Sequence, residues 1–197
     1  FALRTLGCTA GIVVTASHNP PEYNGYKVYW DDGAQVTAPK DKEIITEVKS
    51  ISDYHTVKTM AKEEAMQAGL YNVIGKDIDD AYMVELKKQI IHPDVITEMA
   101  EDIKIVYTPL CGTGNVPVRR VLSELGFKHV YVVPEQENPD PKFTTLDYPN
   151  PEDPKAFTYA LRLAKEKDAD IVLATDPDAD RLGIYAKDSK TGEYIPF

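Results

Sequence analysis

Short apolar runs alternate with helical patterns over the second half of the chain, and this alternation most limits the possible folds. Strands are expected at 103–107, 129–133 and 169–175, with one helix ending at Leu125 and another over 155–167. Strands that alternate with helices favour parallel pairing, and ligands then gather at the carboxyl ends of the strands. The sequence therefore predicts an α/β fold of two three-layer α/β/α domains with mixed, mostly parallel sheets.

The first half predicts a different order of elements. A β-branched run at 11–16 indicates a buried strand, and Asp31-Asp32-Gly33 indicates a hairpin turn. Helices are expected after Pro39, over 58–70 and over 77–91. We place a domain boundary near residue 98, which gives domains 1–98 and 99–197. Six prolines between residues 134 and 154 predict a long loop.

Composition limits the partners and the compartment. The chain has 32 acidic and 22 basic residues, a formal charge of −10, which argues against nucleic acid or an anionic membrane as partner. No run approaches the roughly 20 apolar residues of a membrane-spanning helix. Cys8 and Cys111 have no paired spacing, so a reducing, cytoplasmic location is expected. The start at Phe1 without Met suggests a fragment of a longer protein.

Three aspartates alternate directly after the predicted strand at 169–175. Asp176, Asp178 and Asp180 have a spacing that lets their carboxylates converge on one hard cation, such as magnesium or calcium. Without a cation the three carboxylates would repel one another. A solvated acidic turn explains the same residues, because Asp and Pro are common in turns.

Two other metal-loop patterns can be compared with this segment. The calcium helix-loop-helix pattern requires glycine at loop position six and glutamate at position twelve, where this chain has Arg181 and Lys187. A haloacid-dehalogenase phosphotransferase would use Asp176 as a nucleophile. Asp180 stands where that type usually has Thr or Val, so a three-ligand metal site is favoured, and the aspartyl nucleophile stays as an alternative.

A second polar cluster follows the predicted strand at 11–16. Ser17 is presented beside His18 and Asn19, but a free serine is a weak nucleophile that needs a base, a metal or a reactive donor. Stabilisation of a turn explains these residues equally well. The segment 112–115, Gly-Thr-Gly-Asn, lacks the lysine and the spacing of nucleotide-binding loops, and it predicts a tight turn.

The segments TASHNP at 15–20, NGYK at 24–27 and DPDADR at 176–181 resemble the α-D-phosphohexomutase family of phosphoglucomutases and phosphomannomutases. The resemblance runs through the whole chain. The runs GYKVYW and TPLCGTGNVPVRR are most similar to the bacterial phosphoglucomutase branch related to phosphopentomutases. Relatives commonly have histidine where this chain has Cys111.

The resemblance implies an activity and a set of site residues. Ser17 would be the phosphoserine, and Asp176, Asp178 and Asp180 would bind one Mg²⁺ together with an oxygen of the Ser17 phosphate. His18, Lys27 and Arg181 would lie near the phosphoryl group, with Lys27 a candidate for proton transfer. A hexose 1-phosphate and a hexose 6-phosphate, most simply of glucose, would interconvert through a bisphosphorylated hexose; mannose and pentose phosphates are alternatives.

The resemblance also implies partners within one longer chain. The family fold has four domains around a cleft, and the sugar-binding and phosphate-binding loops lie in the third and fourth. Neither loop is present in these 197 residues. This piece alone is therefore expected to have negligible mutase activity. A non-catalytic cation-binding module is a further alternative.

Overall fold

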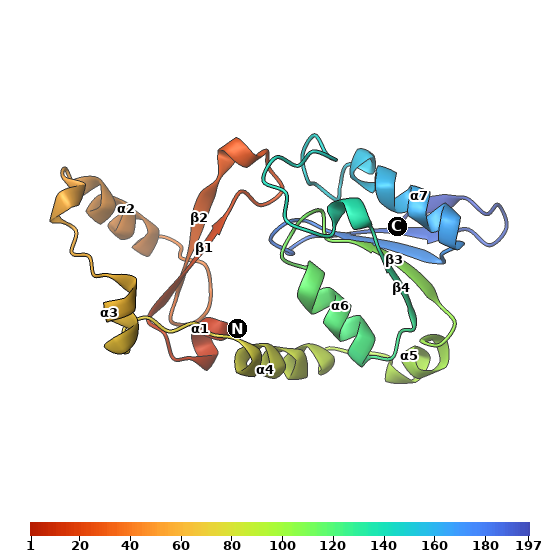
Figure 1. The fold of residues 1–197 in the computed structure, drawn as a ribbon, viewed down its shortest axis with the longest axis horizontal. Helices are drawn as coiled ribbons and strands as arrows, with labels where there is room; N and C mark the ends of the chain where they lie inside the picture. Colours follow the sequence, from red (N-terminus) through yellow and green to blue (C-terminus); the bar gives the residue numbers. More distant parts are fainter. The chain divides into compact units, whose positions relative to one another are not determined.

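The computed structural model describes residues 1–197, and the chain divides into two compact units. The first comprises Phe1–Val13 and Lys27–Val84, and the second comprises Val14–Tyr26 and Glu85–Phe197. Figure 1 shows the path of the chain through both. The boundary near residue 98 stays a prediction. No helix has the length and apolar character needed to cross a membrane.

A five-stranded mixed sheet forms the centre of the second unit, with the strand order β4-β3-β5-β6-β7. The strand β3 pairs in parallel with β4 and β5, while β5–β6 and β6–β7 are antiparallel. The mixed α/β architecture is thus confirmed, with parallel pairing confined to β4-β3-β5. The strands are β3 Lys104–Thr108, β4 His129–Val132, β5 Ile171–Thr175, β6 Leu182–Lys187 and β7 Tyr194–Pro196.

Helices cover both faces of this sheet. Helix α6 (Asn115–Glu124) connects β3 to β4, and α7 (Thr158–Lys167) precedes β5 on the other side of β3. Figure 1 shows α7 on one face and α6 on the opposite face. The connection from β3 through α6 runs to β4, on the side of β3 away from β5. The carboxyl ends of β3 and β5 therefore flank a topological switch point, which is where α/β sheets bind ligands.

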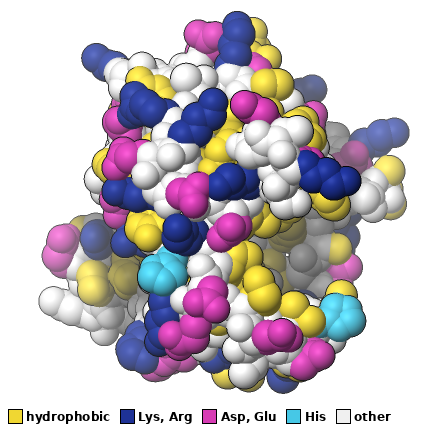
Figure 2. All heavy atoms as spheres, turned by 90° about the vertical axis from the view of Figure 1, so that its right-hand side faces the viewer, with side chains coloured by type: hydrophobic (Ala, Val, Ile, Leu, Met, Phe, Trp, Pro, Cys, Tyr) yellow, Lys and Arg dark blue, Asp and Glu magenta, His cyan; other side chains and the backbone are white.

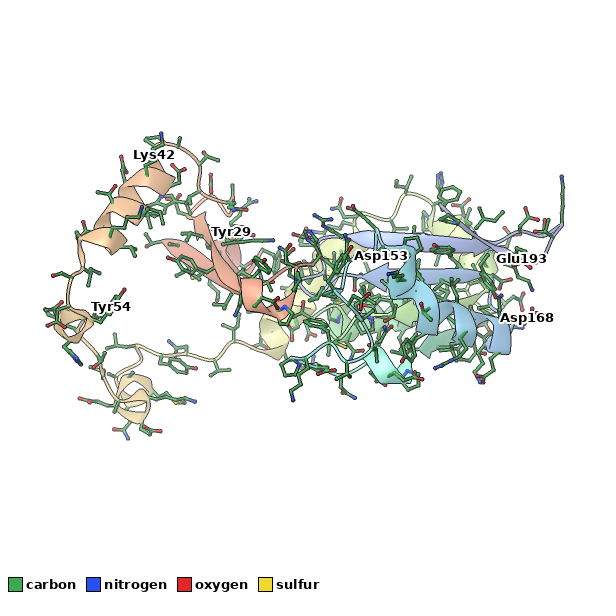
Figure 3. The ribbon with its side chains drawn as sticks, turned by 90° about the horizontal axis from the view of Figure 1, so that it is seen from above. Tyr29, Lys42, Tyr54, Asp153, Asp168 and Glu193 are labelled. Atoms are coloured by element: carbon green, nitrogen blue, oxygen red, sulfur yellow. The ribbon has the colours of Figure 1, made fainter.

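The core lies between the sheet and α7. Val106 and Val172 from the strands and Ala160 and Ala164 from the helix are fully buried, and Phe157 packs its ring 4.6 Å from that of Tyr185. The small alanines let α7 lie close to the strands. Asp153 and Asp168 lie at the two ends of this helical segment (Figure 3). The segment between β4 and the 3-10 helix Pro154–Phe157 has a 3-10 turn at Pro134–Gln136 and is otherwise irregular, as its prolines predict.

The first unit has much less buried surface. It contains most of a two-stranded sheet formed by β1 (Ala10–Thr15) and β2 (Gly25–Trp30), whose ends within Val14–Tyr26 belong to the second unit. The predicted turn at 31–33 is present, with Gly33 at φ +82°. Figure 3 labels Tyr29 on β2, Lys42 on α2 and Tyr54 in a 3-10 turn. The helices are α1 Ala2–Thr5, α2 Lys40–Ser50, α3 Lys62–Gln67 and α4 Lys76–Lys87, followed in the second unit by α5 Pro93–Met99.

The prediction that the strand at 11–16 is buried was wrong. Ile12 is 66% exposed and Val14 is 72% exposed. The strand has the β-branched composition of a buried strand, but a two-stranded sheet has few neighbours that could cover its faces. The apolar run therefore identified the strand correctly and its burial incorrectly.

Charged side chains of both signs are interspersed on the surface of the second unit. Several form ion pairs across elements, such as Lys187 with Asp168 and Arg162 with Glu135. On the face shown in Figure 2, basic and acidic groups alternate and no broad basic area forms. A highly charged polyanion would find no continuous positive surface on this face.

Candidate functional site

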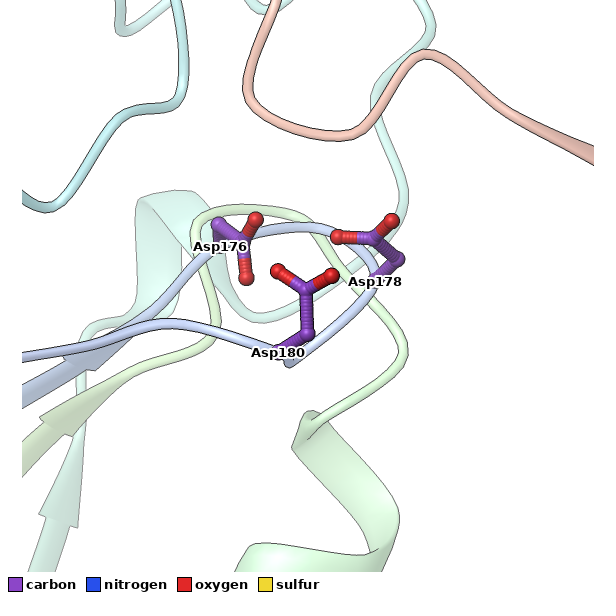
Figure 4. A group of neighbouring side chains, drawn as sticks. All are labelled: Asp176, Asp178 and Asp180. Carbon is purple, nitrogen blue, oxygen red and sulfur yellow. The ribbon is translucent and has the colours of Figure 1, made fainter. Parts of the chain in front are cut away.

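The three predicted aspartates lie together on the loop between β5 and β6. Asp176 follows β5 directly, and oxygen atoms of Asp176, Asp178 and Asp180 all lie within 4.8 Å of one another. Figure 4 shows the three carboxylates turned toward a common space. Asp176 is buried, Asp178 is half-buried and Asp180 is exposed, so the cluster opens from the sheet edge toward solvent.

The loop folds around the carboxylate of Asp176. The backbone N–H of Arg181 donates to Asp176 Oδ1 at 3.0 Å, and the N–H of Ala179 donates to the Asp176 carbonyl at 2.9 Å. Ala179 has φ +58°, a left-handed conformation that costs a non-glycine residue about 1 kcal/mol or more. The turn brings Asp178 and Asp180 back toward Asp176.

The electrostatics of the cluster favour a cation. Burial, together with a smaller contribution from the neighbouring Asp178 carboxyl, raises the pKa of Asp176 to about 6. Asp176 Oδ2 is buried and accepts no hydrogen bond. A buried carboxylate oxygen without a donor is costly unless a cation or proton takes its place. Carboxylate oxygens are the ligands that Mg²⁺ prefers, so these residues fit such an ion.

The structure excludes the calcium helix-loop-helix alternative at this position. The segment after Asp180 enters β6 rather than a helix, and Lys187, at the position of the twelfth ligand, pairs with Asp168. The loop therefore connects two antiparallel strands of one sheet, at the edge where β3 and β5 end.

Ser17 lies in the loop that follows β1. Its Oγ is 3.1 Å from His18 Nδ1, and both side chains are half-buried. Ser17 has φ +53°, which is uncommon for a residue other than glycine, Asn or Asp. Such a conformation persists only where the surroundings hold it, and it is found disproportionately at functional sites.

Thr15 joins the Ser17 loop to the acidic loop. Its hydroxyl accepts the N–H of Ser17 at 2.7 Å and donates to Asp178 Oδ2 at 3.3 Å. These residues are 163 positions apart in sequence and belong to the same compact unit. One threonine side chain thus contacts both the backbone of the predicted phosphoryl carrier and a predicted metal ligand.

The two remaining predicted residues belong to the end of the acidic loop and to β2. Arg181 directs its guanidinium to Glu152, with Nη1 2.7 Å from Oε1, while its backbone supports Asp176. Lys27 is half-buried on β2, in the other unit. The roles of Lys27, His18 and Arg181 at a phosphoryl group stay predictions.

Sequence reasoning did not single out Thr15 or Glu152. Thr15 was noted only as the first residue of the TASHNP segment, and Glu152 was one of several acidic residues in a proline-rich segment. Cys111, where relatives commonly have histidine, is buried with φ +63°, and burial raises the pKa of its thiol. Its N–H donates to the carbonyl of Gln136 at 2.9 Å, a structural contact.

Comparison with protein families agrees with the fold and the loops. The description "Phosphoglucomutase/phosphomannomutase, alpha/beta/alpha domain II" matches residues 80–191, and domain I of the same family matches residues 1–55. The chain belongs to the phosphoglucomutase/phosphomannomutase family. This match covers both motif-bearing loops, at 15–20 within domain I and at 176–181 within domain II.

Individual members of this mutase family show the same likeness. A glucose 1,6-bisphosphate synthase of Homo sapiens is 39% identical over 92% of this chain, and a phosphopentomutase of Pongo abelii is 38% identical over 100%. The chain spans 29% and 32% of these two relatives. A solved structure from Thermus thermophilus described as a phosphomannomutase matches 94% of this chain and 38% of its own, with a TM-score of 0.69 and 25% identity.

Proposed function

We propose that this chain carries the phosphoryl-donor serine and the magnesium loop of a phosphosugar mutase. The main support is the hydroxyl of Thr15, which contacts the Ser17 backbone and the Asp178 carboxylate at once. A phosphate on Ser17 would then stand beside three carboxylates. In this proposal Ser17 is the phosphoserine, and Asp176, Asp178 and Asp180 hold one Mg²⁺ together with an oxygen of that phosphate.

The charges explain why a cation belongs in such a site. A phosphoserine carries about −1.5 to −2 charges, and three ionised aspartates add three more. A bound Mg²⁺ would neutralise part of this charge and stabilise the charge that spreads over the phosphoryl oxygens during transfer. The backbone N–H of Arg181, which donates to Asp176 Oδ1, keeps one oxygen of that carboxylate oriented inside the loop.

The transfer requires one bond to form and one to break. The Ser17 Oγ–P bond breaks as a sugar hydroxyl oxygen forms a new bond to phosphorus, and the hydroxyl proton leaves to a base. The resulting bisphosphorylated hexose reverses its orientation in the site, and its other phosphate is transferred back to Ser17. Lys27 is the candidate for the proton transfer, which requires a lowered lysine pKa. His18, 3.1 Å from Ser17 Oγ, orients the serine.

The proposed substrate is a hexose monophosphate, with glucose first and mannose or pentose phosphates as alternatives. The relatives include a phosphoglucomutase, a phosphomannomutase and a phosphopentomutase at 35–38% identity, so they favour the mutase class without choosing the sugar. In the proposal, the groups that select the sugar lie in the third and fourth domains of the full-length chain, and these domains are the partners of the 197 residues described here.

An aspartyl-nucleophile phosphatase is the nearest rival. Its nucleophile would be Asp176, but the side chain of this residue is fully buried, and an attacking carboxylate oxygen must reach phosphorus. A non-catalytic cation-binding module would explain the acidic loop and leave the strained Ser17 without a function.

Phosphopeptide mass spectrometry separates the three possibilities. The protein is incubated with glucose 1,6-bisphosphate and Mg²⁺, quenched in acid, digested and mapped. We expect an acid-stable phosphate on Ser17. A labile acyl phosphate on Asp176 would replace the mutase with the phosphatase, and no adduct on either residue would leave the binding module. The variant Ser123→Ala is a matched control, because Ser123 lies on α6, outside both loops.

A further inference from the structure

The segment after β3, which predicted only a tight turn, contacts the acidic loop closely. We call residues 109–114 the glycine loop and residues 175–181 the acidic loop. Thr113 donates twice to the carbonyl oxygen of Pro177, from its backbone N–H at 2.9 Å and from its hydroxyl at 3.0 Å. A carbonyl oxygen has two lone pairs and can accept both. These bonds fix the backbone between Asp176 and Asp178.

Two glycines make this approach possible. A Cβ at Gly112 would lie 2.3 Å from the Cα and 2.7 Å from the carbonyl oxygen of Pro177. Those are backbone atoms, so they could not move aside without displacing the acidic loop. A Cβ at Gly114 would lie 2.6 Å from the hydroxyls of Thr175 and Tyr107. The absence of side chains at both positions therefore sets how the two loops pack.

A buried hydrogen bond supports the acidic loop from the sheet side. Tyr107 on β3 and Thr175 on β5 share a hydrogen bond of 2.8 Å between their hydroxyls, one residue before Asp176. Burial raises the pKa of Tyr107 to about 12, so this phenol stays protonated over the physiological range. The loop is thus held at its first residue, Thr175, by Tyr107 and at its third residue, Pro177, by Thr113.

The acidic loop needs support of this kind because its own residues destabilise the folded turn. Three carboxylates lie within 4.8 Å of one another, and Ala179 has a left-handed backbone conformation. Like charges at such distances repel, and the left-handed conformation is itself unfavourable for alanine. Contacts from outside the loop must balance both costs before a cation is bound.

We infer that Thr113, packed against the loop through Gly112, is a positioning residue that holds the three aspartates in metal-binding geometry. The inference rests on the proposed magnesium site and assigns the glycine loop a part in it. Because the ligands are already placed, less ordering is required when the ion binds. Residues that orient metal ligands from outside typically contribute 10-fold to 100-fold in affinity.

The test removes one of the two Thr113 bonds. In Thr113→Val the hydroxyl bond is lost while the backbone bond and the side-chain shape remain. We expect Mg²⁺ affinity, measured by isothermal titration calorimetry on the 197-residue chain, to fall by about tenfold. Without metal, the amides of Ala179 and Arg181 should exchange hydrogen faster. Thr113→Ser should restore both properties, and Gly112→Ala should lose more affinity than Thr113→Val.

Thr97→Val is the matched control, because the Thr97 hydroxyl also donates to a proline carbonyl, that of Pro93 at 2.9 Å. It should leave Mg²⁺ affinity and both amides unchanged. Wild-type affinity and exchange in Thr113→Val would overturn the inference, and this variant decides the matter if Gly112→Ala fails to fold. A wild-type chain that binds no Mg²⁺ would instead remove the proposed metal site, while the exchange rates would still show whether Thr113 holds the loop.

Discussion

The two loops proposed to meet at one phosphoryl group are supported very differently. The acidic loop leaves a central strand of a five-stranded sheet, and Thr175 and Asp176 at its start are buried. The Ser17 loop connects the strands of a two-stranded sheet, and Val14 beside it is 72% exposed. Yet both loops hold a non-glycine residue at positive φ, Ser17 and Ala179.

This difference separates two requirements of the site. Metal ligands must be held close together against their mutual repulsion, and a packed sheet edge with the glycine loop beside it can do this. The serine must be presented to a partner, and its half-buried side chain, on a loop outside the larger sheet, leaves the hydroxyl partly accessible. The side chain of Thr15 contacts both loops, so its hydroxyl is one contact that sets the register between the proposed donor and the proposed metal site.

The largest expected effect concerns the serine itself. Ser17→Ala removes the only proposed phosphate acceptor, so labelling of the intact protein by a bisphosphorylated hexose should be abolished. Intact-protein mass spectrometry measures the gain of one phosphate. Ser50→Ala, at the end of α2, should label like the wild type. Undiminished labelling of Ser17→Ala would eliminate the donor assignment.

Substitutions in the two sheets should have different costs in unfolding free energy. Phe157→Ala removes a fully buried ring in contact with Tyr185 and should cost about 3–5 kcal/mol of unfolding free energy. Ile12→Ala changes a residue that is 66% exposed and should cost only about 0.5 kcal/mol. Urea denaturation followed by circular dichroism compares them. Equal costs would mean that β1 is covered in solution.

Loss of one proposed metal ligand should strongly weaken Mg²⁺ binding at the acidic loop. Asp178→Asn removes one carboxylate charge and should weaken Mg²⁺ binding by about 100-fold, at the upper end of what changes around metal ligands cost. Calorimetric titration measures it. Asp147→Asn, an exposed carboxylate outside the acidic loop, serves as the control. An unchanged affinity in Asp178→Asn would contradict the three-ligand site.

Acid should weaken the same binding by proton competition. The pKa of Asp176 is raised to about 6, so its proton must leave before the carboxylate can bind Mg²⁺. From pH 7.5 to pH 5 the affinity should fall about tenfold. The stability that this raised pKa gives the metal-free chain is present below about pH 4 and lost as the pH rises through 6. A pH-independent affinity would contradict the prediction.

The smallest expected effect concerns the bridge between the loops. Thr15→Val removes the hydrogen bonds to Ser17 and Asp178, worth about 1 kcal/mol, and should slow Ser17 phosphorylation about fivefold. Thr15→Ser keeps the hydroxyl and should stay near the wild-type rate. A quench-flow time course of labelling in the intact protein measures both. Equal rates in Thr15→Val and the wild type would show that the loops are aligned by other contacts.

The secondary-structure elements and the candidate metal ligands could be predicted from local sequence. Hydrophobic patterns predicted β3, β4 and β5 within a few residues, because strand and helix periodicities are local properties. The alternation of Asp176, Asp178 and Asp180 predicted that their carboxylates converge, because residues so close in one loop have few ways to avoid one another. The family resemblance came from the same local segments.

Burial and the contacts between distant segments became visible only in the folded chain. The β-branched run of β1 could not reveal that its sheet has two strands, because burial depends on what packs against a strand. The bonds from Thr15 to Asp178 and from Thr113 to Pro177 join residues 163 and 64 positions apart. No local pattern encodes such pairs, since they exist only once folding has brought these separate loops together.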